Sequence, residues 1–241
     1  MTLFDEFDRI AVINLPSRPD RRRAILKDLA RAGIAADDPR LVIFPAIRPE
    51  DAGAFPSIGA HGCFRSHLGV ITAAERDGVQ RLLILEDDLQ LQDAACHAQE
   101  LLAQGLRGND WGFAYPGHTY VLPEQAAGDP ERAVWLTSDA PLVCAHFYAL
   151  HHQILGPLRQ YLEACLQRPA GDPAGGPMHV DGAFSMFRAM TGATTLLASP
   201  SLGGQRSSRS DIHANRWYDR WPGVAVAVAW LRRCRNHFAT A

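Results

Sequence analysis

The chain has 241 residues, of which 47% are hydrophobic and 21% are charged. This composition is that of a globular protein, and the length is sufficient for one α/β domain with a sizeable buried core. The formal net charge of -2 lacks the basic excess that nucleic-acid binding requires, so we expect no nucleic-acid partner.

The cysteines and the N-terminus bear on location. The five cysteines are scattered and form no CxxC pair, which argues against a zinc site or a disulfide framework and for a reducing compartment. The N-terminus MTLFDEFDRI carries acids where a signal peptide has a basic region, and no segment reaches the roughly 18 apolar residues of a membrane span. We therefore expect a cytoplasmic protein.

Strands and helices alternate in the first third of the chain. Apolar runs predict strands over 9–15, 41–44 and 81–85, and amphipathic segments predict helices over 20–32 and 64–76. Asp20 is the expected N-cap of the first helix, and Gly33 is expected to end it. The alternation predicts a parallel or mostly parallel sheet covered by helices.

The remainder of the chain is less regular. Helices are predicted over 92–106 and 152–166, strands over 111–115 and 140–150, and loops over 116–130, 168–178 and 203–210. A short apolar helix that ends in a basic cluster is predicted over 221–238.

Three adjacent acids, Glu86, Asp87 and Asp88, follow the predicted strand 81–85. Carboxylates are rarely buried unless their charge is compensated, and Mg2+ or Mn2+ prefers such oxygen ligands. In open α/β sheets, ligands bind beyond the carboxyl ends of the strands. The alternative interpretation is a polar turn with solvated acids, or an N-cap of the next helix.

Arginines follow the first predicted strand at positions 18 and 21–23. Arginine side chains and a helix N-terminus together suit a nucleotide diphosphate, although a solvated helix face would look the same. No GxGxxG or GxxxxGK[ST] motif follows this strand, so there is little support for a dinucleotide site or a P-loop.

Ser66 and His67 lie in a polar cluster that could contact a nucleotide or orient a carboxylate. Cys63 and His67 share a helix face, which also allows a Cys-His nucleophile. A buried cysteine and a capping serine are the alternative explanation.

One acid and one histidine later in the chain are further candidates. Asp181 lies between apolar residues and is either a general base or a helix N-cap. His213, in a Ser-Asp-Ile-His segment, could complete a metal site begun by the central acids, or lie in an ordinary surface loop.

In chain order, several motifs resemble glycosyltransferase family 25, which includes bacterial lipooligosaccharide galactosyltransferases and collagen galactosyltransferases. The matching segments are VINLPSRPDRR (12–22), GCFRSH (62–67), LILEDDL (83–89), VDGAF (180–184) and the tract 205–212. The chain departs from the family at Gly59-Ala60-His61, where many relatives have Gly-Glu, and this leaves the donor sugar open.

The resemblance implies an α/β, GT-A-like fold of the nucleotide-diphospho-sugar transferase type, with a central, mostly parallel mixed sheet flanked by helices. It implies inverting, Mn2+- or Mg2+-dependent transfer of a sugar, usually galactose from UDP-galactose, to a glycan or lipid-linked glycan. Carried over by motif, the metal ligands are Asp88, Glu86 and His213, the catalytic groups are Asp181 and Glu86, and the nucleotide contacts are Asn14, Arg18, Arg22, Ser66, His67 and Asp87.

The expected organisation is a single domain over 1–241. Residues 1–115 would bind nucleotide and metal, 116–220 would bind the acceptor, and 221–241 would form the C-terminal helix. Tryptophans and arginines in 217–238 suit peripheral contact with the inner face of a membrane, or a helix packed on the core.

Two other functions fit the same acids. One is a metal-dependent nucleotidyl- or phosphotransferase, since carboxylates after a buried strand also serve phosphoryl transfer. The other is a catalytically silent family member that acts as a binding module.

Overall fold

The computed structural model describes residues 2–92, 95–119, 133–142 and 144–206, with no description of the side chains of 95–98. The predicted helix over 221–241, His213, and most of the predicted loop over 116–130 lie outside these residues. None of the helices within the described ranges is long and apolar enough to cross a membrane.

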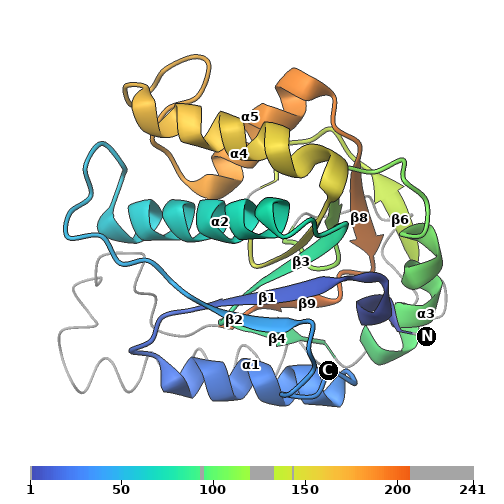
Figure 1. Cartoon of the computed structure of the whole chain (residues 1–241). Coiled ribbons are helices and arrows are strands. Elements are labelled where there is room, and N and C mark those ends of the chain that lie inside the picture. Colours follow the sequence, from blue (N-terminus) through green and yellow to red (C-terminus); the bar gives the residue numbers. More distant parts are fainter. Residues whose placement is uncertain (1, 93–94, 120–132, 143, 207–241) are drawn as a thin grey trace.

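A seven-stranded mixed sheet lies at the centre of the molecule (Figure 1). Its strand order is β2-β1-β3-β7-β5-β8-β6. The strands are β1 (Arg9–Asn14), β2 (Leu41–Pro45), β3 (Arg81–Glu86), β5 (Phe113–Tyr115), β6 (Val134–Thr137), β7 (Phe147–His151) and β8 (Thr195–Ser199). Strands β7 and β6 run antiparallel to their neighbours, whereas β1 is parallel to β2 and β3, and β5 is parallel to β8. The expected α/β class with a mixed sheet is confirmed.

Helices cover both faces of the sheet. Helices α2 (Ile58–Arg76), α4 (His152–Gln167) and α5 (Val180–Thr191) lie on one face, and α1 (Pro19–Arg31) lies on the other (Figure 1). The 3-10 helix η1 (Leu3–Glu6) and α3 (Ala95–Gly105) pack with the α1 side.

Strand β3 alternates between two cores because successive side chains of a strand point to opposite faces. Leu82 and Ile84 pack in the core with α2, α4 and α5, while Leu83 and Leu85 pack in the core with α1. All four side chains are buried, as the apolar run predicts. The acids are therefore held at the carboxyl end of a strand that is buried on both faces.

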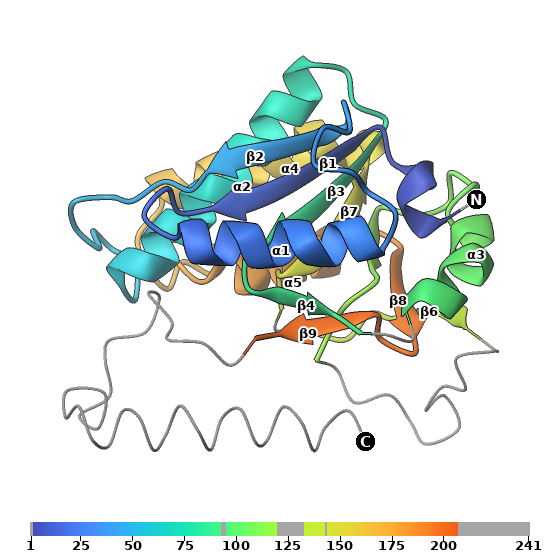
Figure 2. The same cartoon turned by 90° about the horizontal axis from the view of Figure 1, so that it is seen from below.

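A small second sheet extends the site. Strand β4 (Leu89–Leu91) pairs antiparallel with β9 (Gly203–Gln205), and the pair lies next to α1 (Figure 2). The pairing of Leu89 with Gln205 brings the end of the described chain beside the acids.

Two predicted helix starts are wrong. The N-cap of α1 is Arg18 rather than Asp20, because Pro19 is preorganised for the first helical position and Asp20 follows in the first turn. Helix α2 begins at Ile58 rather than Phe64, because the hydroxyl of Ser57 accepts a 3.0 Å hydrogen bond from the Ala60 N–H and caps the helix there.

The strand predicted over 140–150 is also shorter than expected, because β7 begins at Phe147. The backbone of Leu142 bonds to a side chain instead of a strand. Its N–H donates to the Ser185 hydroxyl at 3.0 Å, and its carbonyl accepts from that hydroxyl at 3.2 Å.

Candidate functional site

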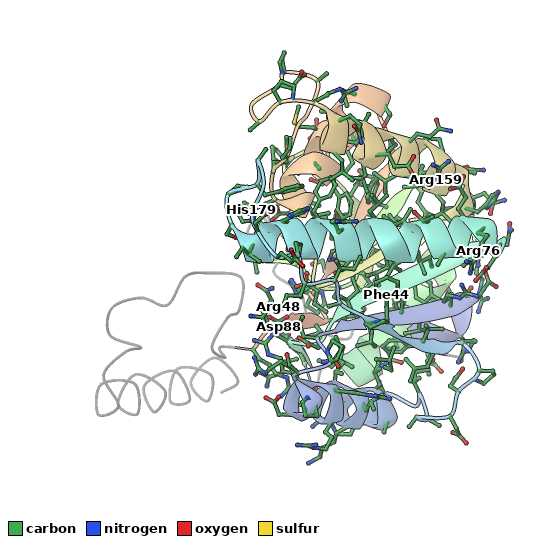
Figure 3. All side chains as sticks on the ribbon, turned by 60° about the vertical axis from the view of Figure 1, so that its left-hand side comes forward. Phe44, Arg48, Arg76, Asp88, Arg159 and His179 are labelled. Atoms are coloured by element: carbon green, nitrogen blue, oxygen red, sulfur yellow. The ribbon has the colours of Figure 1, made fainter. Side chains whose placement is uncertain are left out.

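A pocket of about 350 Å³ opens where β1, β2 and β3 end and α1 and α2 begin. Figure 3 shows Asp88 and Arg48 at this end of the molecule, with Arg76 and Arg159 at the opposite end. The three parallel strands place their carboxyl ends at one edge, which is where ligands bind in open α/β sheets. Among the predicted site residues, Arg18, Ser66, His67, Glu86, Asp87 and Asp88 line the pocket.

Asp87 is bound by the protein itself. Its carboxylate accepts a 2.7 Å hydrogen bond from the Asn14 amide and a 3.0 Å ion-paired bond from Arg21. The Asn14 amide also donates to the Arg18 carbonyl at 3.2 Å. Asp87 is 6% exposed and each of its oxygens has a partner, so it joins β1, α1 and β3 at the wall of the pocket.

Glu86 points in a different direction, towards α2. One of its oxygens lies 3.1 Å from His67 Nε2 and accepts from the Cys63 thiol at 3.5 Å, and the other accepts from the Gln205 amide at 3.5 Å. His67 Nδ1 lies 2.8 Å from the buried hydroxyl of Tyr148. Burial is the largest single influence and raises the pKa of Glu86, but the hydrogen bond and charge of His67, the charge of His146 and the hydrogen bond from Cys63 together leave that pKa below the ordinary value.

Asp88 is the acid that the protein leaves available. Its Oδ1 is buried and has no hydrogen-bond partner among the described residues, while its Oδ2 lies 3.9 Å from Arg21. Burial and the charge of Glu86, opposed by Arg21, raise the pKa of Asp88 to about 7. An unpartnered buried carboxylate oxygen is a fitting ligand for a hard divalent cation.

Three arginines face the pocket, and they are not all those expected. Arg18 lines it while held by a two-point ion pair to Asp20, at 3.0 and 2.9 Å. Arg21 and Arg48 also line it. Arg22 is exposed on α1 and does not line the pocket, in contrast to the position that the motif implies for it. Arg48 follows β2 and belongs to no motif, so no sequence pattern pointed to it.

Ser66 fixes a wall of the pocket. Its hydroxyl donates to the Gly62 carbonyl at 2.6 Å and accepts from the Ile47 N–H at 2.8 Å. The segment after β2 is thereby attached to α2. A Cβ at Gly62 would lie 2.5 Å from the Ile47 carbonyl oxygen, so this close approach requires glycine.

The Cys-His nucleophile interpretation does not fit the geometry. The Cys63 thiol donates to Glu86, and burial together with the negative charge of Glu86 raises the pKa of this thiol well above its ordinary value. A nucleophilic cysteine requires the opposite shift.

Asp181 lies on α5, outside the wall of the pocket. Asp181 lies in the first turn of α5, whose N-cap is His179, and its Oδ1 accepts from the Gly182 N–H at 2.8 Å. It is not among the residues that line the pocket. His213 lies outside the described residues.

Comparison with known proteins shows partial matches. No family model matches the chain. "Inactive glycosyltransferase 25 family member 3" of Mus musculus is 27% identical over 137 residues, and its Homo sapiens counterpart is 28% identical over 137 residues. Each match covers 49% of this chain and 23% of the relative, so the chain matches about a quarter of the length of these relatives.

Two solved structures show a limited likeness. A glycosyltransferase involved in the glycosylation of the major capsid of PBCV-1 has a TM-score of 0.49 and 12% identity, over 84% of this chain and 93% of that one. A mannose-1-phosphate geranyltransferase from Thermus thermophilus has a TM-score of 0.41 and 13% identity, over 78% of this chain and 72% of that one. About half of this chain is therefore similar in sequence to members of glycosyltransferase family 25.

Proposed function

We propose that this chain is a metal-dependent inverting glycosyltransferase that moves a sugar, galactose from UDP-galactose, onto a hydroxyl of a surface glycan or lipooligosaccharide. The observation that carries the proposal is the buried Oδ1 of Asp88, which has no hydrogen-bond partner within the described part of the chain, in a pocket that arginines also line. The relatives are named inactive, so catalysis by this chain is part of the proposal.

The cationic side chains of the pocket suit the leaving group. Negative charge builds on the nucleoside diphosphate as the sugar–phosphate bond breaks, and positioned cations stabilise it. Arg18, Arg21 and Arg48 approach the pocket from the start of α1 and the end of β2. In this proposal they bind and orient the diphosphate.

Asp88 and Glu86 would hold the divalent cation, Mn2+ or Mg2+. When bound, the ion would supply further neutralisation of the diphosphate charge. Asp87 is proposed to have a positioning role and not to bind the ion. Its hydrogen bonds from Asn14 and Arg21 fix the carboxyl end of β3 and the orientation of Arg21.

The remaining roles concern the acceptor. A carboxylate must take the proton of the attacking hydroxyl, and Asp181 is the proposed base. Residues 116–220 are proposed to recognise the glycan, and residues 221–241 are proposed to contact the membrane surface.

A turnover assay with product identification tests the proposal. Wild type and Asp88→Asn are incubated with a panel of UDP-, GDP-, CMP- and dTDP-sugars, with Mn2+ or with a chelator. We expect Mn2+-dependent release of UDP from UDP-galactose that Asp88→Asn abolishes. Release of sugar 1-phosphate, the group that leaves when the nucleotidyl group of a nucleoside diphosphate sugar is transferred, would indicate a nucleotidyltransferase instead. Metal-dependent binding without turnover would indicate a silent family member.

A further inference from the structure

Cys63, His67 and Glu86 form a cluster that the proposed transfer reaction leaves without a full explanation. Cys63 and His67 are one helical turn apart on α2, and Glu86 ends β3. Their potential ligand atoms, the Cys63 sulfur, a His67 ring nitrogen and a Glu86 oxygen, all lie within 4.8 Å of one another. Within the described part of the chain, this trio and not the row of acids is where at least three such atoms converge.

We propose that Cys63, His67 and Glu86 form a second metal site, selective for a borderline-soft divalent ion such as Zn2+ or Co2+. The site shares Glu86 with the hard-ion site proposed at Asp88, but its thiol and imidazole ligands favour a softer ion. It does not depend on the transferase reaction.

The distances fit tetrahedral coordination. Zinc bonds of about 2.0–2.3 Å place neighbouring tetrahedral ligands roughly 3.4 Å apart. The Glu86 oxygen lies 3.1 Å from His67 Nε2 and 3.5 Å from the Cys63 sulfur. All three residues line the pocket, so an ion held by them would be accessible to a substrate atom or a water as a fourth ligand.

The surroundings orient the ligands. Tyr148 contacts His67 Nδ1 at 2.8 Å, which leaves Nε2 directed at Glu86. In metal sites the second ring nitrogen of a histidine ligand commonly has such a partner. The Gln205 amide holds the other oxygen of Glu86 at 3.5 Å, so the oxygen shared by Cys63 and His67 stays on their side.

Ligand chemistry separates the two ions. A thiolate and an imidazole favour Zn2+ or Co2+, whereas Mn2+ and Mg2+ favour the carboxylate oxygens of Asp88 and Glu86. The Cys63 proton leaves to solvent as the ion binds, and His67 binds through Nε2 with its proton on Nδ1 donated to Tyr148. Because Glu86 belongs to both sets, Zn2+ and Mn2+ compete for one carboxylate.

Cobalt absorption tests the site directly. We expect Co2+ titrated into the full chain to give a thiolate-to-cobalt charge-transfer band, which added Zn2+ then removes by displacing the cobalt. The band should persist in Cys165→Ala, a control that removes a buried thiol of α4 outside the cluster. It should disappear in Cys63→Ala. A band that persists in Cys63→Ala, or that never forms in wild type, overturns the proposal.

Two further measurements test the site without relying on the folding of Cys63→Ala or on the proposed transferase activity. X-ray absorption of the zinc-loaded wild type should show one sulfur at about 2.3 Å, and a shell of nitrogen and oxygen alone contradicts the site. Asp88→Asn should keep the cobalt band, because Asp88 is not a ligand of this ion. Loss of the band in Asp88→Asn would mean that the ion bound by Cys63 also needs Asp88, and would overturn a soft-ion site that Asp88 does not share.

Discussion

Asn14 donates a 2.7 Å hydrogen bond to Asp87 and so joins the carboxyl ends of β1 and β3. Arg21 donates a 3.0 Å hydrogen bond to the other oxygen of Asp87. Asp87, the middle acid of the motif, therefore has a structural role, whereas Glu86 points towards α2. Asp88 is the acid whose Oδ1 has no partner among the described residues and is available to a ligand. Three adjacent carboxylates therefore have three different environments.

Asn14→Ala should destabilise the fold, because it leaves the buried Asp87 carboxylate with one donor fewer. We expect the free energy of unfolding to fall by about 1–3 kcal/mol, as for other unsatisfied buried polar groups. Urea unfolding measures the change. A loss no larger than that of Gln92→Ala, at an exposed residue, would show that the bond contributes little.

The raised pKa of Asp88 should appear in the pH dependence of stability. Between the ordinary pKa of 3.8 and about 7, the folded metal-free chain holds a proton that the unfolded chain has lost. Stability from this group is therefore complete below about pH 4 and is lost as the pH rises towards 7, by at most about 1.4 kcal/mol per pH unit. Unfolding in chelator across this range should show a slope in wild type that is absent in Asp88→Asn. Parallel curves for the two proteins would contradict the assignment.

Gly62→Ala should displace the pocket wall. The added Cβ would lie 2.5 Å from the Ile47 carbonyl oxygen, so the segment after β2 must move away from α2. We expect a lower melting temperature and weaker nucleotide binding. Gly108→Ala is the matched control, because its added Cβ would meet nothing within 4 Å and its φ is not positive. Equal behaviour of the two variants would show that the contact is not needed.

Arg21→Ala and Arg22→Ala distinguish the structural from the motif-based assignment. Arg21 lines the pocket and binds Asp87, whereas Arg22 is exposed and does not line the pocket. Calorimetric titration with UDP and Mn2+ should show a loss of affinity of roughly tenfold for Arg21→Ala, about 1.4 kcal/mol, and little change for Arg22→Ala. A larger loss of UDP affinity in Arg22→Ala than in Arg21→Ala would instead support the nucleotide contact that the family motif implies for Arg22.

Much of the fold could be predicted from local patterns. The apolar run 82–85 predicted a strand buried on both faces because the hydrophobic residues leave no polar side, and the alternation of strands and helices predicted the α/β class. The start of α2 was missed because the Ser57 cap precedes glycines that lower the helix propensity of its first turns. Strand 140–150 was overextended because the hydrogen bonds between Leu142 and Ser185 are invisible to periodicity.

The sequence predicted most of the residues that line the pocket, but not the hydrogen bonds and ion pairs between them. The position of the acids after a strand located the pocket, since parallel strands end at one edge. The division of roles among them depends on partners that are distant in sequence, such as Asn14, Tyr148 and Gln205. Arg48 belongs to no sequence motif. It lines the pocket because the segment after β2 is held against α2 by the hydrogen bond from the Ile47 N–H to the Ser66 hydroxyl.

The central claim is that Asp88 binds a divalent cation together with a nucleoside diphosphate. Calorimetric titration of UDP into wild type, Asp88→Asn and Asp37→Asn, each with Mn2+ and with chelator, tests it without requiring an acceptor or turnover. Asp37 is an exposed acid away from the pocket. We expect Mn2+-dependent UDP binding by wild type and by Asp37→Asn, and loss of this binding in Asp88→Asn. Binding that is equal with and without Mn2+, or unchanged in Asp88→Asn, would contradict it.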